Sequence, residues 1–367
     1  MSDTRQLKDL IVEMVSKKGS DLHISAGSPP RTRIDGLLKP MEGQAVVTPE
    51  EAKRLCMEYA TEEMKEKFQS FHELDFSFGV EGVSRFRANV YLEKESVAGA
   101  FRALPWKIPS PDSLFLPLKV KELAQRPNGL ILVTGATGSG KSTTIASILD
   151  QINQTREEHL ITVEDPIEYV FNHGKCMVHQ REVGQHTESF QSALKYILRQ
   201  DPDIVLVGEM RDLETMQAAI TTAETGHLVF ATLHTNSAVQ TIDRIIDVFP
   251  STQQPQVRSQ LAFILEAVLC QQLLPVKTGG RRLALEMLFP NYAIRNLIRE
   301  GKTHQIYAQM QSGQATTGMM TMTQSLVNLI KAGLIDLETA KEYAPDREEL
   351  ETAYRRIQAG SGESEKN

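Results

Sequence analysis

The chain has 367 residues, of which 41% are hydrophobic and 24% charged, and its formal net charge is -7. This length favours about two domains, and the sequence shows neither a signal peptide nor an apolar run that could span a bilayer. The negative charge disfavours nucleic acid as a partner, although a local basic channel would be compatible with it. Three isolated cysteines, Cys56, Cys176 and Cys270, predict neither disulfides nor a zinc site. We therefore expect a cytoplasmic protein.

The first hundred residues mix helix and strand patterns. The expected elements are helices over 4–18 and from 48 onward, and strands over 21–26, 84–92 and 96–104. Polar and apolar residues alternate in the expected strand 84–92, so Arg85 and Arg87 share one face of the strand while Phe86 points the other way. A proline-rich stretch follows, which is typical of an extended linker. We expect a small α+β domain over 1–106 and a linker over 107–119.

Beyond the linker, short apolar runs alternate with helical patterns. The expected strands are 129–135, 159–165, 203–209, 227–234 and 282–288, and helices are expected over 141–152 and 189–200. This alternation predicts an α/β domain over 120–358, in which a mostly parallel sheet is covered by helices and ligands bind beyond the carboxyl ends of the strands. The polar tail 359–367 is expected to be disordered.

The most specific motif is GATGSGKST, which fits the phosphate-loop pattern between an expected strand and an expected helix. Its glycines allow backbone N–H groups to converge on phosphate, Lys141 adds a positive charge, and the Ser142 hydroxyl is placed to bind Mg²⁺. The expected nucleotide-binding residues are Gly135, Ala136, Thr137, Gly138, Ser139, Gly140, Lys141, Ser142 and Thr143. The motif predicts a site for ATP with Mg²⁺.

Carboxylates at neighbouring strand ends would complete a hydrolytic site. The candidates are Glu164, which precedes Asp165, and Glu209. Gly208 occupies the position where a magnesium-binding aspartate usually stands, so Glu209 would assist the metal, directly or through water, or act on the nucleophile. The alternative for each carboxylate is a role as a helix cap or turn former.

Two histidines flank the expected strand 227–234, and their spacing across the strand is too long for a shared metal ion. We expect His234 to sense the γ-phosphate, with a hydrogen-bonded structural role as the alternative for His234 and still more for His227. The arginines of the first domain, among them Arg87 and Arg102, are either solvated or able to reach the phosphates of a neighbouring subunit. The residues themselves do not decide between these roles.

Several strings together resemble one family, the secretion ATPases, which are hexameric RecA-like motors of type IV pili and type II secretion. The matching strings are GATGSGKST, ITVEDPIEY, LRQDPDIVLVGEMRD, TAETGHLVFATLHTN and, in the first domain, SDLHISAG and SRFRANVY. The resemblance implies a PAS-like N-terminal domain and a RecA-like ATPase domain. It also implies that Glu164 and Glu209 serve catalysis and metal, that His227 and His234 sense nucleotide, and that Arg87 and Arg102 act on an adjacent subunit.

One further string indicates a branch of this family. AIRNLIREGK fits a capped amphipathic helix and resembles the signature of the pilus retraction ATPases. Its residues are Ala293, Ile294, Arg295, Asn296, Leu297, Ile298, Arg299, Glu300, Gly301 and Lys302. The apolar stripe is expected to comprise Ala293, Ile294, Leu297 and Ile298, with Arg295, Asn296, Arg299 and Glu300 on the opposite, polar face. Extension and secretion motors of this family typically carry a longer N-terminal region and a four-cysteine zinc motif, and neither feature is found in this sequence.

The resemblance therefore implies a cytoplasmic homohexamer at the inner membrane, where ATP hydrolysis powers pilus retraction and twitching motility. The implied partners are an inner-membrane platform protein and an accessory paralogue. The alternatives are an extension or type II secretion ATPase, a RecA-like nucleic-acid translocase, and a nucleotide-binding switch without turnover.

Overall fold

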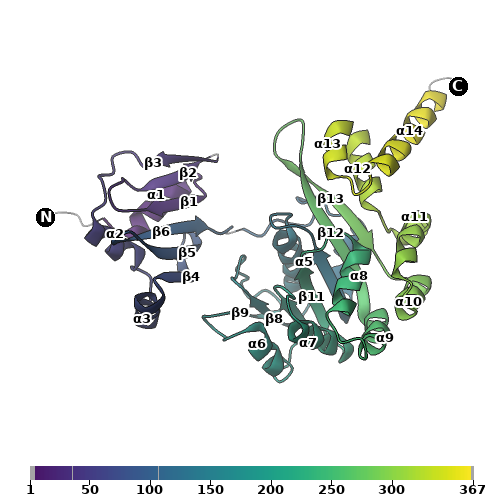
Figure 1. Ribbon diagram of the computed structural model, residues 1–367, viewed down its shortest axis with the longest axis horizontal. Helices are drawn as coiled ribbons and strands as arrows, with labels where there is room; N and C mark the ends of the chain where they lie inside the picture. The colour runs from purple at the N-terminus through teal and green to yellow at the C-terminus, as the bar shows by residue number, and fades with distance from the viewer. Residues whose placement is uncertain (1–4, 35, 106, 365–367) are drawn as a thin grey trace. The chain divides into compact units, whose positions relative to one another are not determined.

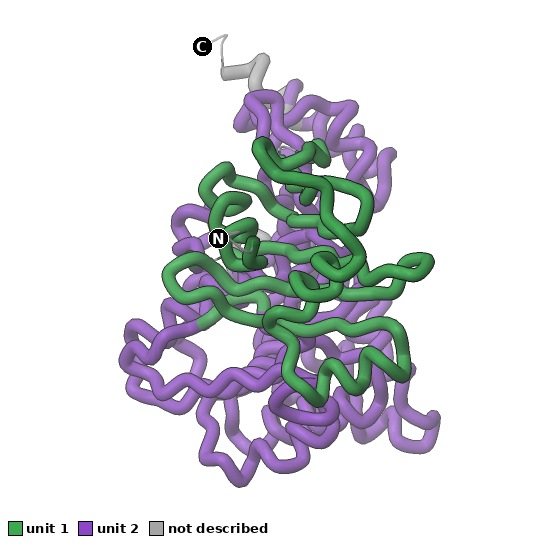
Figure 2. The backbone as a smooth tube through the Cα atoms, turned by 90° about the vertical axis from the view of Figure 1, so that its left-hand side faces the viewer, with its two compact units in different colours: residues 1–107, 168–170 green, residues 108–167, 171–367 purple. Residues whose placement is uncertain are grey.

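The computed structural model describes residues 5–34, 36–105 and 107–364 and divides into two compact units (Figure 2). The first unit is Met1–Lys107 with Glu168–Val170, and the second is Ile108–Ile167 with Phe171–Asn367. Most of the stretch expected as a linker, 107–119, is thus grouped with the second unit. Within this stretch Leu116 is buried, and the ring centroid of Phe115 lies 3.6 Å from the guanidinium carbon of Arg282.

The first unit is an antiparallel sheet with helices packed on one face. Its elements are α1 (Leu7–Ser16), β1 (Asp21–Ile24), β2 (Arg31–Ile34), β3 (Leu37–Pro40), α2 (Pro49–Cys56), α3 (Glu62–Phe71), β4 (Glu73–Val80), β5 (Ser84–Glu93) and β6 (Ser96–Ala103). The strand order is β3-β2-β1-β6-β5-β4. Side chains from alternate strand positions, such as Phe86 and Phe101, pack with Leu10 of α1 and Leu55 of α2 in one core.

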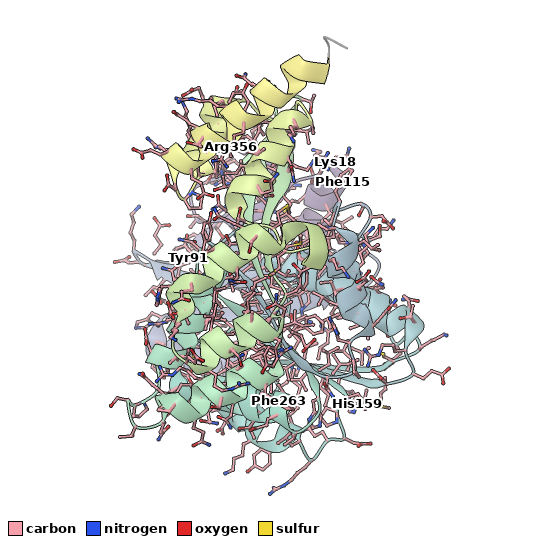
Figure 3. All side chains as sticks on the ribbon, turned by 90° about the vertical axis from the view of Figure 1, so that its right-hand side faces the viewer. Lys18, Tyr91, Phe115, His159, Phe263 and Arg356 are labelled. Atoms are coloured by element: carbon pink, nitrogen blue, oxygen red, sulfur yellow. The ribbon has the colours of Figure 1, made fainter. Side chains whose placement is uncertain are left out.

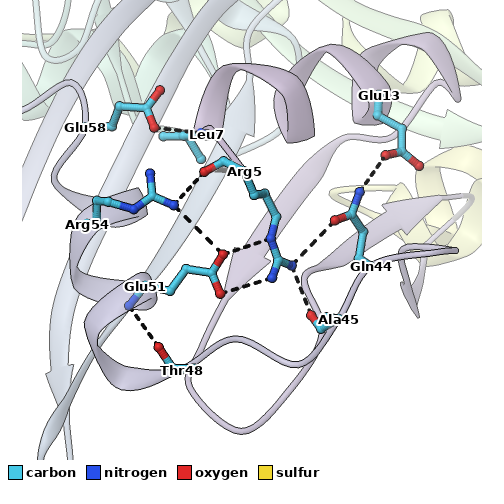
Figure 4. A network of polar contacts seen from close by, with 9 residues as sticks. All are labelled: Arg5, Leu7, Glu13, Gln44, Ala45, Thr48, Glu51, Arg54 and Glu58. Carbon is cyan, nitrogen blue, oxygen red and sulfur yellow. Dashed lines mark hydrogen bonds and ion pairs between the residues drawn. The ribbon is translucent and has the colours of Figure 1, made fainter. Parts of the chain in front are cut away.

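A polar network fixes the start of α1 (Figure 4). The residue before the helix, Gln6, gives no side-chain cap, and Glu58 instead accepts hydrogen bonds from the backbone N–H groups of Leu7 at 2.7 Å and Lys8 at 3.4 Å. Arg5 binds both carboxylate oxygens of Glu51 at 3.0 Å. A helix start without its own cap is stabilised by such an acceptor from elsewhere in the chain.

The second unit contains the predicted α/β sheet. Its elements are α4 (Leu118–Lys121), η1 (Glu122–Gln125), β7 (Gly129–Thr134), α5 (Lys141–Thr155), β8 (His159–Glu164), β9 (Met177–Glu182), α6 (Phe190–Ile197), β10 (Ile204–Val207), α7 (Leu213–Glu224), β11 (Leu228–Leu233), α8 (Ala238–Asp247), α9 (Gln254–Ile264), β12 (Leu265–Pro275), β13 (Arg281–Leu288), α10 (Tyr292–Arg299), η2 (Thr303–Gln305), α11 (Ile306–Thr317), α12 (Met322–Lys331), α13 (Leu337–Tyr343) and α14 (Arg347–Ser364).

The sheet has the order β13-β12-β7-β11-β10-β8-β9, and every pair except β12–β13 is parallel (Figure 1). All residues of β7 are buried, so both faces of this strand are covered. A buried parallel strand gives a continuous apolar run, which is why the sequence revealed β7, β8, β10 and β11. The predicted α/β fold with a mostly parallel sheet, preceded by a smaller α+β domain, is confirmed.

The sequence prediction missed β2, β3 and β4 of the first unit and two strands of the second. β9 reads MVHQRE and β12 continues directly from α9 without a turn, so neither shows a bounded apolar run. The predicted strand 282–288 forms β13, which is the antiparallel edge strand rather than one of the parallel strands.

The chain ends in α12, α13 and α14, which gather beyond the sheet (Figure 1) and share a core with Leu274 of β12 and Ala284 of β13. The expectation of a disordered tail over 359–367 stays a prediction; α14 is assigned as far as Ser364. The remaining three residues lie outside the described part of the chain.

Candidate active site

The phosphate loop connects β7 to α5 at the carboxyl edge of the sheet. Its glycines Gly135, Gly138 and Gly140 have φ values of 136°, 79° and 90°, which L residues with a side chain rarely adopt. A Cβ at Gly135 would lie 2.3 Å from the carbonyl oxygen of Gln271, so the loop backbone passes directly over β12. The Lys141 ammonium donates to the carbonyls of Gly135 and Ala136 at 2.9 and 3.1 Å. The loop therefore holds a buried cation at its centre.

The start of α5 is suited to phosphate. The N-cap residue of this helix is Gly140, which has no side chain with which to cap the first turn. Ser139 is buried, and its Oγ has no hydrogen-bond partner in the described part of the chain. A buried hydroxyl beside uncapped amides and an ammonium group fits a bound polyphosphate, so the residues of the expected nucleotide site fit that ligand.

Glu209 follows β10 and meets two partners. Its carboxylate accepts from Arg211 at 2.8 Å and lies 3.2 Å from Nε2 of His234, which follows β11. Burial raises the pKa of the Glu209 carboxyl, but the hydrogen bond and charge of Arg211, together with His234, outweigh it and hold this pKa below its usual range. Glu209 is therefore an ionised carboxylate at neutral pH, as a base or a water-orienting group must be.

Gly208 owes its identity to close packing. A Cβ at this position would lie 3.0 Å from the carbonyl oxygen of Val163 and 3.1 Å from Cα of Glu164. An aspartate side chain here would push β10 away from β8, which pairs with it through Gly208 N–H to Val163 O at 2.8 Å. The absence of the usual aspartate is thus a consequence of strand packing.

Glu164 ends β8 and is buried. Its Oε1 accepts hydrogen bonds from Thr162 at 2.6 Å and Gln180 at 3.2 Å. These bonds fix one oxygen of the carboxylate at the sheet edge. Because β8 pairs with β10, Glu164 lies at the strand end next to the one that carries Glu209.

The two histidines occupy opposite ends of β11. Leu233 pairs with Thr134, so His234 follows the strand beside the phosphate loop. His227 precedes the strand, and its carbonyl accepts from Gly129 at the start of β7 while its Nδ1 lies 3.0 Å from the carbonyl of Thr222. The structure thus brings His234 to the phosphate loop of its own chain and does not bring His227 there.

Arg87 and Arg102 lie directly opposite each other on β5 and β6. The Arg102 Nε donates to Asp21 at 2.8 Å, and Arg87 lies 3.9 Å from Asp75. Both arginine side chains are more than half exposed, so one rigid strand face presents two guanidinium groups. They belong to the first unit, whereas the phosphate loop belongs to the second.

The string 293–302 forms α10 and its C-terminal cap. Asn291 caps the helix start by accepting from the N–H of Ile294 at 2.9 Å, and Gly301 adopts a φ of 70° after its end. Ile294 and Ile298 are fully buried, as the apolar stripe requires, but Ala293 is exposed and does not belong to that stripe. Arg299 is exposed.

Arg295 differs from the expectation that it lies on the free polar face. Its guanidinium donates to the carbonyls of Ala262 and Phe263 at 2.7 and 2.8 Å and pairs with Glu266 at 2.8 Å. These bonds satisfy the C-terminal carbonyls of α9, beside the exposed Phe263 (Figure 3). Arg295 therefore connects α10 to the end of α9.

The magnesium assignment depends on few protein ligands. Within the described residues, no group of three or more His, Cys, Asp or Glu side chains is arranged to hold a metal ion. Mg²⁺ binds through one or two protein oxygens together with substrate phosphates, and the hydroxyl of Ser142 at the start of α5 matches this pattern.

Sequence reasoning missed the partners that shape the site, namely Arg211, Thr162, Gln180 and the pair Gln271–Thr144, whose side chains are joined at 2.7 Å. Arg211 lies two residues after Glu209 and Thr162 two residues before Glu164, so proximity in the chain was the signal available for these two. Gln180 and Gln271 come from strands, and Thr144 from α5, whose packing is not visible in the sequence.

Comparison with known proteins gives matches over most of the chain. A family model described as "Type II/IV secretion system protein" matches residues 116–330. The chain is 45% identical over 343 residues to the type IV pilus retraction ATPase PilT of Pseudomonas aeruginosa, which covers 92% of this chain and 98% of that protein. It is 38% identical over 346 residues to the type IV pilus ATPase PilU of the same organism, an alignment that covers 94% of this chain and 90% of PilU.

A solved structure is similar over the whole fold. The crystal structure of the pilus retraction motor PilT with bound ADP matches with a TM-score of 0.90 and 54% identity, covering 95% of this chain and 99% of that one. None of the helices in the described residues combines the length and apolar character that a membrane span requires.

Proposed function

This chain is an ATPase that belongs to the type II/IV secretion system protein family, and from that premise we propose that it is the homohexameric motor that retracts type IV pili. Pilus disassembly by this motor would drive twitching motility. The ATPase assignment rests on one observation above all: the phosphate loop, Glu209 and His234 meet at one edge of the sheet. Retraction, rather than extension, is supported by AIRNLIREGK and by the similarity to PilT.

The proposed chemistry is in-line attack of water on the γ-phosphate of ATP. Lys141 and the amides at the start of α5 bind the phosphates, and Glu209 orients the water and accepts its proton. His234 contacts the γ-phosphate, and Arg87 or Arg102 of an adjacent subunit neutralises the charge that develops on it. Mg²⁺, held by Ser142 with Glu209 assisting through water, would offset phosphate charge when bound. Glu164 provides a second carboxylate at the same edge of the sheet, where it would assist catalysis and metal binding.

The proposed partners are other copies of this chain and membrane proteins at the pilus base. The motor would lie in the cytoplasm against the inner membrane and act on a PilC-like platform protein, with a PilU-like paralogue as accessory. Nucleic acid is not among the proposed partners, because the net charge is -7.

The catalytic assignment is tested by Glu209→Gln. The amide keeps the shape of the side chain but cannot accept the proton, so turnover should fall by about 100-fold or more while ATP binding persists. Steady-state hydrolysis and the affinity for a fluorescent ATP analogue are measured together. The matched control is Glu157→Gln, at an exposed carboxylate away from the site. Normal turnover in Glu209→Gln would refute the role of this residue.

The direction of work is tested in cells. A strain that lacks this chain should keep its pili but fail to retract them, as seen by following labelled pili under the microscope. Loss of the pili themselves would favour an extension motor instead.

A further inference from the structure

Glu286 is a buried carboxylate that the proposed chemistry does not use. It lies on β13 opposite Cys270 of β12 and is only 2% exposed. Burial of a carboxylate is costly unless hydrogen bonds compensate it. Its contacts therefore indicate what the fold gains from it.

Each oxygen of Glu286 accepts from the first residue of a different helix. Oε1 accepts from the backbone N–H of Ala238 at 2.7 Å, and Oε2 accepts from that of Met322 at 3.2 Å. Ala238 begins α8 and Met322 begins α12. The positive ends of two helix dipoles thus meet at one carboxyl group. Burial raises the pKa of Glu286, and the hydrogen bonds from the two helix starts counteract part of that effect.

The first of these helices begins next to the nucleotide site. Only three residues, Thr235 to Ser237, separate His234 from α8. This connection is held in place, because the hydroxyls of Thr235 and Thr241 lie 2.7 Å apart and the N–H of Asn236 donates to Gln240 at 3.0 Å. A shift of His234 against a phosphate would therefore be passed to the start of α8.

The second helix belongs to the C-terminal group. Leu326 of α12 shares a core with Ala340 of α13 and Leu350 of α14. Other bonds also join α12 and the residues just before it to β13, since Ser325 of α12 accepts from the N–H of Leu285 at 2.9 Å and Met320, two residues before α12, pairs with Met287. Loss of Glu286 would therefore leave α12 attached to the sheet but no longer joined to α8 through this carboxylate.

We propose that Glu286 is a positioning residue that couples the His234 segment to the C-terminal helices α12–α14. In this role the carboxylate keeps the starts of α8 and α12 at a fixed spacing. Nucleotide binding at His234 would then change the stability of α12, and α12–α14 would in turn hold His234 in place beside Glu209. The proposal rests on the proposed ATPase site and adds a route from that site to a distant part of the chain.

The test is hydrogen exchange of the full chain with and without Mg²⁺ and a non-hydrolysable ATP analogue, followed by mass spectrometry. In the wild type, the analogue should slow exchange in the phosphate loop, at the start of α8 and over 319–327 at the start of α12. In Glu286→Gln, whose side chain offers a single acceptor oxygen, the loop should still respond but 319–327 should not. Its kcat should fall about tenfold while KM for ATP stays within about twofold.

Ser325→Ala is the matched control, because it removes a bond between α12 and β13 without touching α8. It should keep the exchange response of 319–327 and the wild-type kcat. The proposal is overturned if 319–327 does not respond in the wild type, a measurement that needs no variant, or if it responds equally in Glu286→Gln. Failure of the phosphate loop itself to respond would overturn the proposed ATPase site instead.

Discussion

The chemistry of Glu209 is set by two side chains, the guanidinium of Arg211 and the imidazole of His234, on either side of its carboxylate. Arg211 provides the larger favourable contribution to ionisation, and burial opposes it. Since the folded pKa of Glu209 lies below the unfolded value, its contribution to stability is present above the unfolded pKa and is lost as the pH falls through the folded one.

Arg211→Ala should therefore shift the acid limb of the pH–rate profile. Without the guanidinium, burial raises the pKa of Glu209, and the acid limb of kcat/KM for ATP should move to higher pH. Arg211→Lys keeps the charge and should move it less. An acid limb at the wild-type position in Arg211→Ala would show that Glu209 is not the group whose protonation stops the reaction.

At the scale of single elements, α10 carries two arginines with different surroundings. Arg295 is three-quarters covered and bonds to α9 and Glu266, whereas Arg299 is exposed and contacts Asn296 within its own helix at 2.8 Å. The sequence places both on the polar side of one amphipathic helix. The neighbouring α9 makes Arg295 a packing residue and leaves Arg299 accessible.

Arg295→Ala should lower the free energy of unfolding by about 2 kcal/mol, because it removes charge-assisted bonds and leaves the last carbonyls of α9 without this donor. Arg299→Ala should change that free energy by less than about 0.5 kcal/mol. Urea unfolding followed by circular dichroism measures both. If Arg295→Ala is as stable as the wild type, the contacts to α9 do not stabilise the protein.

The same pair separates stability from retraction. Under the proposed function, Arg299→Ala should form hexamers and hydrolyse ATP normally but retract pili poorly. If that variant retracts at the wild-type rate, the helix marks the family without contributing an exposed contact to its function.

At the scale of the whole molecule, the phosphate loop lies in the second unit, and the paired arginines Arg87 and Arg102 lie on a strand face of the first. An active site shared between subunits would explain why a rigid sheet presents two exposed guanidinium groups.

Mixed hexamers provide the test. Lys141→Ala should be inactive alone, and so should the variant of whichever arginine serves catalysis, Arg87→Ala or Arg102→Ala. Unfolding and reassembling an equal mixture should restore activity at about a quarter of the interfaces, where an intact loop meets an intact arginine. The control is a mixture of the purified variants that has not been unfolded and reassembled. If reassembled mixtures of Lys141→Ala with either arginine variant stay inactive, the site is not shared in this way.

The sequence by itself was sufficient for the phosphate loop, for β7, β8, β10 and β11, and for the carboxylate Glu209. Each of these is a local pattern: glycines at fixed spacing, or a buried apolar run that ends in a polar residue. The α/β fold followed from their alternation, because parallel strands need crossover helices.

Only the tertiary structure decided how distant residues act together. It placed His234 against Glu209, left His227 at the other end of its strand, and showed that a side chain at Gly208 would crowd Val163 and Glu164 where β8 and β10 approach closely. It also joined α8 and α12 at Glu286. These contacts depend on strand register and on which faces pack, and residues that touch across tens of positions leave no periodic signal in a single sequence.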